Sequence, residues 1–226
     1  MTEGQFSVQG PHQGQPVLAA GKRLEKASAA MILVHGRGAS AEDILALAAE
    51  LAHPDFAYLA PQAAGNTWYP HPFMAPIASN EPFLSSALAA VGETLARLSQ
   101  AGIPAERTIL LGFSQGACLA LEFAARHPRR YAGVAGLSGG LIGPNPGQPD
   151  ASSDTQRAYS GALDGTPILL GCSEVDFHIP KERVVHSADI FQQLGGQVTL
   201  RLYPNMGHTI NQDELDAVQE MMASMA

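Results

Sequence analysis

The stretch Gly112-Phe113-Ser114-Gln115-Gly116 decides the fold. It follows a short apolar run at 108–111, typical of a buried strand, and precedes an Ala/Leu-rich run at 117–121, typical of a buried helix. Glycines two residues either side of Ser114 suit a sharp strand-to-helix turn, because Cβ atoms there would collide. Such a turn lifts a serine hydroxyl above a sheet on strained backbone. A five-residue pattern also arises by chance, but the flanking strand and helix favour a nucleophile at Ser114.

The composition fits one domain over residues 1–226. Apolar residues make up 46%, enough for a sizeable core, and the net charge of −8 argues against nucleic acid or anionic membrane as a main partner. Residues 1–10 lack the pattern of a secretory signal, and no apolar run approaches the ~20 residues of a membrane span. Cys118 and Cys172 fall in predicted buried elements, and no Cys/His metal-ligand spacing occurs. We therefore expect a reduced, cytoplasmic protein without membrane insertion, metal or cofactor.

Strand-like and helix-like segments alternate along the chain. Buried strands are predicted at 29–34, 56–60, 108–111, 131–137, 168–171 and 198–202, with a short edge strand at 15–20. Helices are predicted after Ser40, over 84–98, after Ser114, from Pro180 and over 215–225. This alternation predicts an α/β fold with a mostly parallel central sheet and helices on both faces. Residues 1–14 are expected to be poorly ordered, and the connections at 61–80 and 138–165 are too short for a large helical lid.

A serine hydroxyl becomes a good nucleophile only beside a base that a third group orients. His208 lies in a Gly/Pro-containing loop between the last strand and the last helix, where such a base belongs. Asp176 follows the preceding strand and is the candidate acid, with Glu174 two residues away as the alternative. The other histidines are assigned other roles, and solvated positions are expected for His12, His53, His127 and His186.

Five further short motifs occur along the chain in this order: His35-Gly36-Arg37-Gly38, Ala60-Pro61-Gln62, Asn66-Thr67-Trp68, Leu137-Ser138-Gly139 and Gly207-His208. With the Ser114 turn, they resemble the carboxylesterase/phospholipase branch of the α/β-hydrolases, which is related to acyl-protein thioesterases. The resemblance implies an α/β-hydrolase fold with Ser114 as nucleophile, His208 as base and Asp176 as the acid. It also implies an oxyanion hole formed by the backbone N–H groups of Arg37 and Gln115.

One position departs from that pattern. The family's thioesterases usually carry an aliphatic residue where Arg37 stands. An arginine there either attracts an anionic substrate group or pairs with a nearby carboxylate away from the chemistry, and we favour the second. His35 is expected to hold its loop by hydrogen bonding rather than to act as a base. For His178, lining of the cleft and a packing role both stay open.

The resemblance predicts a serine carboxylesterase that hydrolyses small to medium carboxylic esters through an acyl-enzyme. Its expected partner is a small-molecule ester, and the chain is expected to be a monomer or a homodimer. An apolar substrate pocket is expected from residues of the two long connections, although they would equally serve to cover the sheet edge: Trp68, Tyr69, Phe73, Met74, Leu141 and Ile142. The alternatives are an acyl thioesterase or lysophospholipase and, from another class, a ligand-binding protein on a hydrolase fold.

Overall fold

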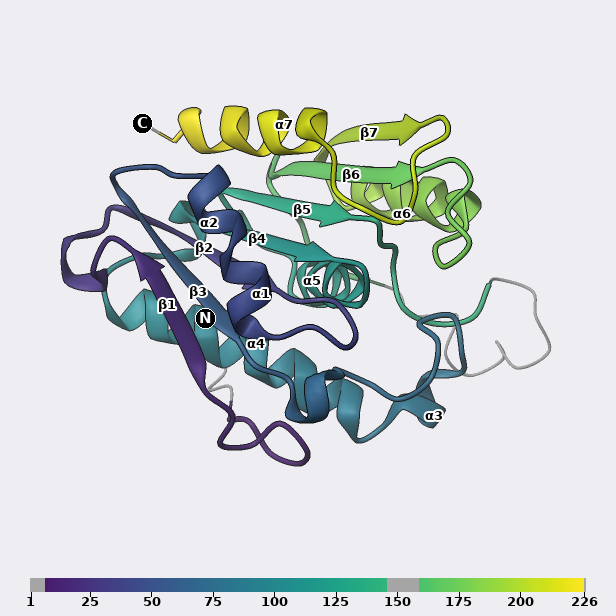
Figure 1. Ribbon diagram of the computed structural model, residues 1–226, viewed down its shortest axis with the longest axis horizontal. Helices are drawn as coiled ribbons and strands as arrows, with labels where there is room; N and C mark the ends of the chain where they lie inside the picture. The colour runs from purple at the N-terminus through teal and green to yellow at the C-terminus, as the bar shows by residue number, and fades with distance from the viewer. Residues whose placement is uncertain (1–6, 146–158, 226) are drawn as a thin grey trace.

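The computed structural model describes residues 7–145 and 159–225. Its strands form a seven-stranded sheet in the order β1-β3-β2-β4-β5-β6-β7 (Figure 1). The strands are β1 (Val17–Gly21), β2 (Ala29–Val34), β3 (Phe56–Pro61), β4 (Thr108–Phe113), β5 (Gly133–Leu137), β6 (Pro167–Ser173) and β7 (Gln197–Tyr203). β1 pairs antiparallel with β3, and all other pairs are parallel. The predicted strands are all present, with ends that differ by at most two residues.

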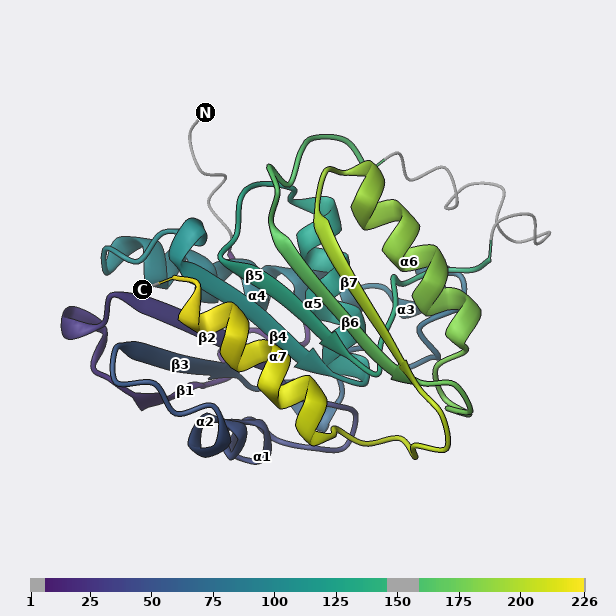
Figure 2. The same ribbon diagram turned by 90° about the horizontal axis from the view of Figure 1, so that it is seen from above.

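Helices cover both faces of this sheet, as predicted. They are α1 (Ala41–Leu45), α2 (Leu47–Glu50), α3 (Ile77–Asn80), α4 (Phe83–Gln100), α5 (Gln115–Arg126), α6 (Lys181–Gln193) and α7 (Gln212–Ala223). Residues of α4, α5 and α6 share one buried cluster, and residues of α1 and α7 share the other, against which α2 also packs. Seen from above, α7 and α6 lie on opposite sides of the sheet (Figure 2).

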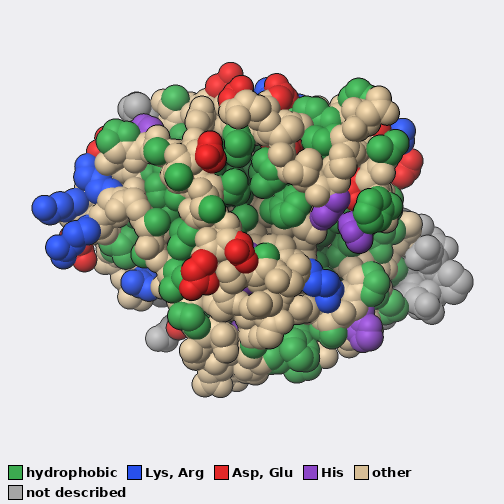
Figure 3. All heavy atoms as spheres, viewed as in Figure 1, with side chains coloured by type: hydrophobic (Ala, Val, Ile, Leu, Met, Phe, Trp, Pro, Cys, Tyr) green, Lys and Arg blue, Asp and Glu red, His purple; other side chains and the backbone are tan. Residues whose placement is uncertain are grey.

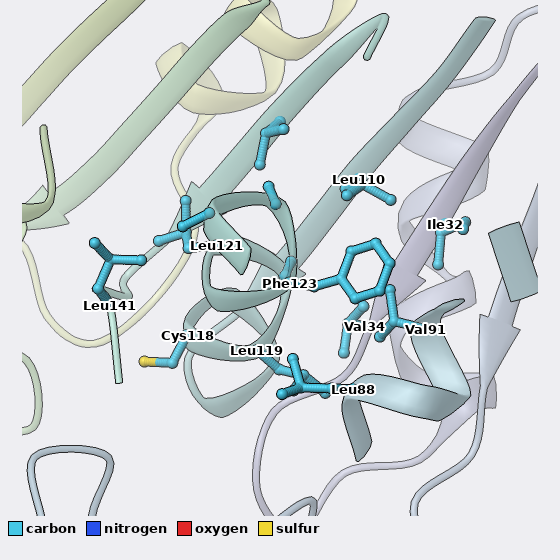
Figure 4. Close-up of a cluster of buried hydrophobic side chains, with 14 of the residues drawn as sticks. Ile32, Val34, Leu88, Val91, Leu110, Cys118, Leu119, Leu121, Phe123 and Leu141 are labelled. Carbon is cyan, nitrogen blue, oxygen red and sulfur yellow. The ribbon is translucent and has the colours of Figure 1, made fainter. Parts of the chain in front are cut away.

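The strand pattern explains this two-sided burial. Successive side chains of a strand point to opposite faces. In β2, Ile32 and Val34 therefore join the cluster of α4 and α5, whereas Met31 and Leu33 join that of α1 and α7. Figure 4 shows Ile32 and Val34 near Phe123 of α5. Each side chain of this size that is fully buried contributes about 1.5–3 kcal/mol.

The order of the strands places the loops after β2 and β4 next to each other at the carboxyl ends of the strands. After β2 the chain adds β3 on one side, next to the earlier strand β1, and it then returns to place β4 on the other side of β2. The loops that follow β2 and β4 therefore diverge at a point where the direction of winding reverses. In open α/β sheets such a switch point, at the carboxyl ends of the strands, forms a crevice that binds ligands.

The expected poor order of residues 1–14 stays a prediction. Within residues 7–14, His12 is buried and its backbone N–H donates to Ser86 Oγ at 3.0 Å, whereas most of its neighbours are exposed. Residues 1–6 lie outside the described residues. The helix predicted after Ser40 is present, with Ser40 and Asp43 forming a capping box, but it is divided at Ala46 into α1 and α2. In the described ranges no helix is long and apolar enough to cross a bilayer.

Candidate active site

The turn between β4 and α5 holds Ser114 in the left-handed region, with φ 55° and ψ −119°. This conformation is strained for a residue with a side chain. The flanking glycines permit it, because a Cβ on Gly112 would collide with the backbone of Gly116, and a Cβ on Gly116 would collide with the Val34 carbonyl. The backbone N–H of Ser114 donates to Leu137 O on the neighbouring strand at 3.0 Å. The turn therefore points Ser114 out at the carboxyl edge of the sheet, above the N-terminus of α5.

Three side chains from three different loops lie in one hydrogen-bonded line there. His208, between β7 and α7, places Nε2 2.8 Å from Ser114 Oγ. Its Nδ1 lies 2.7 Å from Oδ2 of Asp176, which follows β6. The His208 ring also packs against the ring of Phe113, with centroids 5.1 Å apart. The structure thus brings together the three residues that the sequence predicted to act together.

Asp176 is a buried carboxylate with several donors. Its Oδ1 accepts the backbone N–H groups of His178 at 2.8 Å and Ile179 at 3.1 Å. Burial alone would raise the pKa of Asp176, but the hydrogen bonds from His208 and the two backbone donors lower it below its usual value. An ionised Asp176 holds a proton on His208 Nδ1, which leaves Nε2 free to accept one from Ser114. Glu174, the alternative acid, is exposed.

A cavity of about 530 Å³ opens beside this line. Its lining is mainly apolar and aromatic. It consists of Gly36, Arg37, Ala39, Tyr69, Pro70, Pro72, Phe73, Phe113, Ser114, Gln115, Cys118, His178, Ile179 and His208. In Figure 3, histidine and hydrophobic side chains lie next to one another near the carboxyl ends of the strands. The volume of the cavity suits a ligand of a few tens of atoms at most. Within the described ranges no group of three His, Cys, Asp or Glu side chains is placed to hold a metal ion.

The predicted substrate pocket is only partly the one observed. Tyr69, Phe73 and His178 line the cavity, but Trp68, Met74, Leu141 and Ile142 do not. Trp68 is fully buried, and its indole N–H donates to His35 O at 2.9 Å. Leu141 and Ile142 are buried in the core, and Met74 packs against it. These contacts fit the alternative interpretation, in which the four residues cover the sheet, and their contact with a substrate stays a prediction.

Two buried histidines fix the connection that carries Tyr69. His35 Nε2 accepts the Ala63 N–H at 3.1 Å, and its Nδ1 lies 2.8 Å from Gly36 O, so His35 holds its loop as expected. His12 was expected to be solvated, but its Nδ1 accepts the Ala64 N–H at 3.1 Å and its Nε2 lies 2.9 Å from Trp68 O. Burial lowers the pKa of both rings and favours their neutral forms. A histidine in a Gly/Gln-rich segment gave no sequence signal of such a role.

Among the described residues, Arg37 pairs with no carboxylate. Its guanidinium donates instead to the backbone carbonyls of Tyr69, Pro70 and His71, at 2.9, 3.1 and 3.0 Å. These contacts fit the expected structural role of the side chain, although the partners are carbonyl groups and not the expected carboxylate. The Gln115 side chain, which sequence reasoning did not consider, binds the same connection. Its Oε1 accepts the Trp68 N–H at 2.9 Å and its Nε2 donates to Tyr69 O at 2.8 Å.

Solved structures with a similar architecture include proteins named as esterases. A crystal structure of a phospholipase/carboxylesterase from Dyadobacter fermentans is 37% identical with a TM-score of 0.86, and the match covers 96% of this chain and all of that one. A structure of esterase PE8 is 25% identical with a TM-score of 0.72, covering 94% of this chain and 98% of that one.

Sequence relatives match over shorter stretches. Acyl-protein thioesterase 1 of Gibberella zeae is 32% identical over 121 residues, which are 54% of this chain and 49% of that protein. A probable carboxylesterase of Oryza sativa is 32% identical over 118 residues, 52% of this chain and 41% of that protein. The matched stretch thus spans about half the length of these curated relatives or less. The sequence profile of the phospholipase/carboxylesterase family, however, matches residues 16–226. The chain belongs to this family of α/β-hydrolases, as its motifs predicted.

Proposed function

We propose that the protein is a serine hydrolase that cleaves small to medium carboxylic esters through an acyl-enzyme. One observation carries the proposal: the hydrogen-bonded line from Asp176 through His208 to Ser114 ends at a strained turn inside a cavity of about 530 Å³. Strain of this kind persists where function depends on it. A ligand-binding protein would have no need of a base within 2.8 Å of that hydroxyl.

In the first half of the reaction, Ser114 Oγ attacks the ester carbonyl carbon while His208 Nε2 takes the hydroxyl proton. The tetrahedral intermediate collapses, and His208 returns the proton to the departing alcohol oxygen, leaving an acyl group on Ser114. In the second half, water attacks the acyl carbon as His208 takes its proton. His208 then protonates Ser114 Oγ as the carboxylic acid leaves. Ionised Asp176 stabilises the imidazolium in both halves.

The developing oxyanion is assigned to the backbone N–H groups of Arg37 and Gln115. Gln115 is the first residue of α5, so its N–H has no partner one turn earlier in the helix. Arg37 lies in the loop after β2, next to the Ser114 turn, and both residues line the cavity. Removal of one such donor in a hydrolase costs about 2.7–4 kcal/mol of transition-state stabilisation.

Ser114→Ala tests the proposal directly. Wild-type protein should react with a fluorophosphonate probe and hydrolyse p-nitrophenyl acetate, and the variant should do neither, since it lacks the attacking oxygen. Ser85→Ala is a matched control, because Ser85 is exposed on α4. A wild-type protein that binds neither probe nor ester would contradict the assignment. So would a Ser114→Ala variant that is still labelled and active.

A second candidate is an acyl thioesterase, which the relative named acyl-protein thioesterase 1 favours. The same nucleophile and oxyanion hole serve a thioester, which differs only in the leaving group. Matched oxygen esters and thioesters with the same acyl group separate the two. Turnover numbers several-fold higher for the oxygen ester across chain lengths support the carboxylesterase, and the reverse order supports the thioesterase.

A further inference from the structure

The segment Tyr69–His71 forms part of one cavity wall, and its backbone carbonyl groups accept hydrogen bonds from side chains. Pro70 and Pro72 lack backbone N–H groups, so this stretch cannot donate to a regular strand ladder. Its carbonyl groups therefore need donors from elsewhere. Asn80 supplies some order further along, because its Oδ1 accepts the His71 N–H at 2.9 Å and its Nδ2 donates to Pro72 O at 3.3 Å.

The guanidinium of Arg37 supplies three donor contacts to this segment. One nitrogen donates to Pro70 O, and the other donates to both Tyr69 O and His71 O. The guanidinium carbon also lies 6.0 Å from the centre of the Tyr69 ring, within reach of a cation–π contact. Three consecutive carbonyls converge on one planar cation, so Arg37 fixes the path of the backbone at the point where Tyr69 enters the wall.

The same segment is bound from the nucleophile side. The Gln115 amide contacts the Trp68 N–H and the Tyr69 carbonyl, so Tyr69 O accepts from both Gln115 and Arg37. These two residues are also the ones assigned to the oxyanion hole through their backbone N–H groups. Their side chains thus connect that hole to the wall that faces the substrate.

We propose that Arg37 is a positioning residue that sets substrate selectivity by holding Tyr69–His71 in place against the oxyanion loop. The inference rests on the proposed function of this site. Its guanidinium acts through the wall and does not itself touch the ester. The competing role is recognition of an anionic substrate group, because Arg37 is exposed and contributes a positive charge to the cavity lining. The three carbonyl contacts favour the positioning role.

Two substitutions separate these roles. Arg37→Lys keeps the positive charge but replaces the planar fork with a compact ammonium, which cannot bridge three carbonyls in the same geometry. Arg37→Met removes both the charge and the donors. Arg23→Met is a control, because Arg23 is exposed and remote from the cavity. Thermal unfolding of each variant reports whether it is folded, and Arg37→Lys carries the test by itself if Arg37→Met does not fold.

The readout is selectivity between substrates, measured as kcat and KM for p-nitrophenyl esters from acetate to hexanoate and for acetates of increasing alcohol size. A misplaced wall should change the ratio of kcat/KM between the largest and smallest ester in at least one series by about tenfold or more. Arg37→Lys should behave like Arg37→Met, and Arg23→Met like the wild type. A purely structural loss of stability would lower all rates together and leave that ratio unchanged, which would overturn the proposal.

A charged substrate tests the competing role in the same experiment. p-Nitrophenyl butyrate and p-nitrophenyl hemisuccinate have similar sizes, but only the second carries a carboxylate. Equal relative losses on both support positioning. A loss confined to the hemisuccinate and restored by Arg37→Lys would overturn it in favour of charge recognition. If wild-type protein neither hydrolyses these esters nor reacts with a fluorophosphonate, the proposed function itself fails, a result distinct from active wild-type protein with unaltered variants.

Discussion

The loop after β6 and the first turn of α7 each hold a buried carboxylate, and the pKa values of the two are shifted in opposite directions. Asp176 receives hydrogen bonds from His208 and from two backbone N–H groups, and its pKa is lowered. Among the described residues Glu214 receives one hydrogen bond, from the Asn211 N–H to Oε2 at 2.9 Å, and its buried Oε1 has no partner there. Burial raises the pKa of Glu214 to about 7, with Asp213 adding repulsion.

Hydrogen-bond donors can therefore reverse the effect of burial on the pKa of a carboxylate. Both carboxylates lie at the carboxyl half of β6, since Glu214 packs against Gly171 of that strand. Burial disfavours the ionised form of each, but only Asp176 has enough donors to reverse the effect. Asp176 is therefore poised to stay negative beside His208. Glu214, half of the capping box that begins α7, is protonated below about pH 7.

The largest expected effect comes from neutralising the donor-rich acid. Asp176→Asn should lower kcat/KM for p-nitrophenyl acetate by about 10⁴, because an amide no longer holds His208 in the tautomer that accepts the Ser114 proton. The measurement is steady-state kinetics, with circular dichroism to show that the variant is folded. A loss of less than tenfold would mean that His208 does not depend on this carboxylate.

The second effect concerns stability and the donor-poor acid. The folded-state pKa of Glu214, about 7, lies above its unfolded value of 4.5, so its stabilising contribution is complete below about 4.5 and is lost as pH rises through about 7. A shift of this size corresponds to roughly 3 kcal/mol. Glu214→Gln stays neutral and keeps an acceptor for the Asn211 N–H. We therefore expect it to be more stable than the wild type at pH 8 by up to about 3 kcal/mol.

Urea unfolding at pH 4.5 and pH 8 measures this difference. The two proteins should have similar stability at the lower pH and diverge as pH rises, while kcat/KM at pH 7 changes little. Parallel stability curves at both pH values would show that Glu214 is already ionised in the folded protein. In that case the contrast with Asp176 would disappear.

The sequence predicted the parts of this molecule that depend on local pattern. Short apolar runs located the strands, and apolar residues at helical spacing located the long helices. The glycines around Ser114 marked the turn, because only a backbone without Cβ atoms packs so closely there. Ser114, Asp176 and His208 each follow a predicted parallel strand, now β4, β6 and β7. Because parallel strands end on the same side of the sheet, these positions predicted that the three loops lie close together.

What the sequence did not predict depends on irregular segments and distant partners. In the connection after β3, neighbouring residues Trp68 and Tyr69 are both buried, yet only Tyr69 lines the cavity, and no periodicity encodes that choice. The carbonyl partners of Arg37 lie more than thirty residues away. Backbone carbonyls are present at every residue, so a search for charged partners in the sequence overlooks them. The burial of Glu214 likewise follows from contact with Gly171 rather than from its own turn.

A smaller effect on stability is expected at Asn211, whose side chain caps α7 and whose backbone N–H donates to Glu214. Asn211 Oδ1 accepts the Glu214 N–H at 2.9 Å, whereas Glu214 receives its bond from the Asn211 backbone. Asn211→Ala should therefore lower the free energy of unfolding by about 1 kcal/mol through loss of the cap. It should leave the pH dependence attributed to Glu214 in place, as measured by urea unfolding at pH 4.5 and 8. Loss of that pH dependence would show that the side-chain cap, and not burial, controls Glu214.

The smallest expected effect is that of Glu174, a carboxylate outside the hydrogen-bonded line, on kcat/KM. Glu174 is exposed two residues before Asp176, and its backbone N–H donates to Tyr203 O at 3.0 Å. That contact uses the backbone, so Glu174→Gln leaves it intact and removes only a charge screened by solvent. Surface changes of this kind shift free energies by about 0.5 kcal/mol or less, so kcat/KM should stay within about threefold of the wild type. Kinetics on the same ester and in the same buffer as for Asp176→Asn make the two variants directly comparable. A larger loss for Glu174→Gln than for Asp176→Asn would transfer the role of the acid to Glu174.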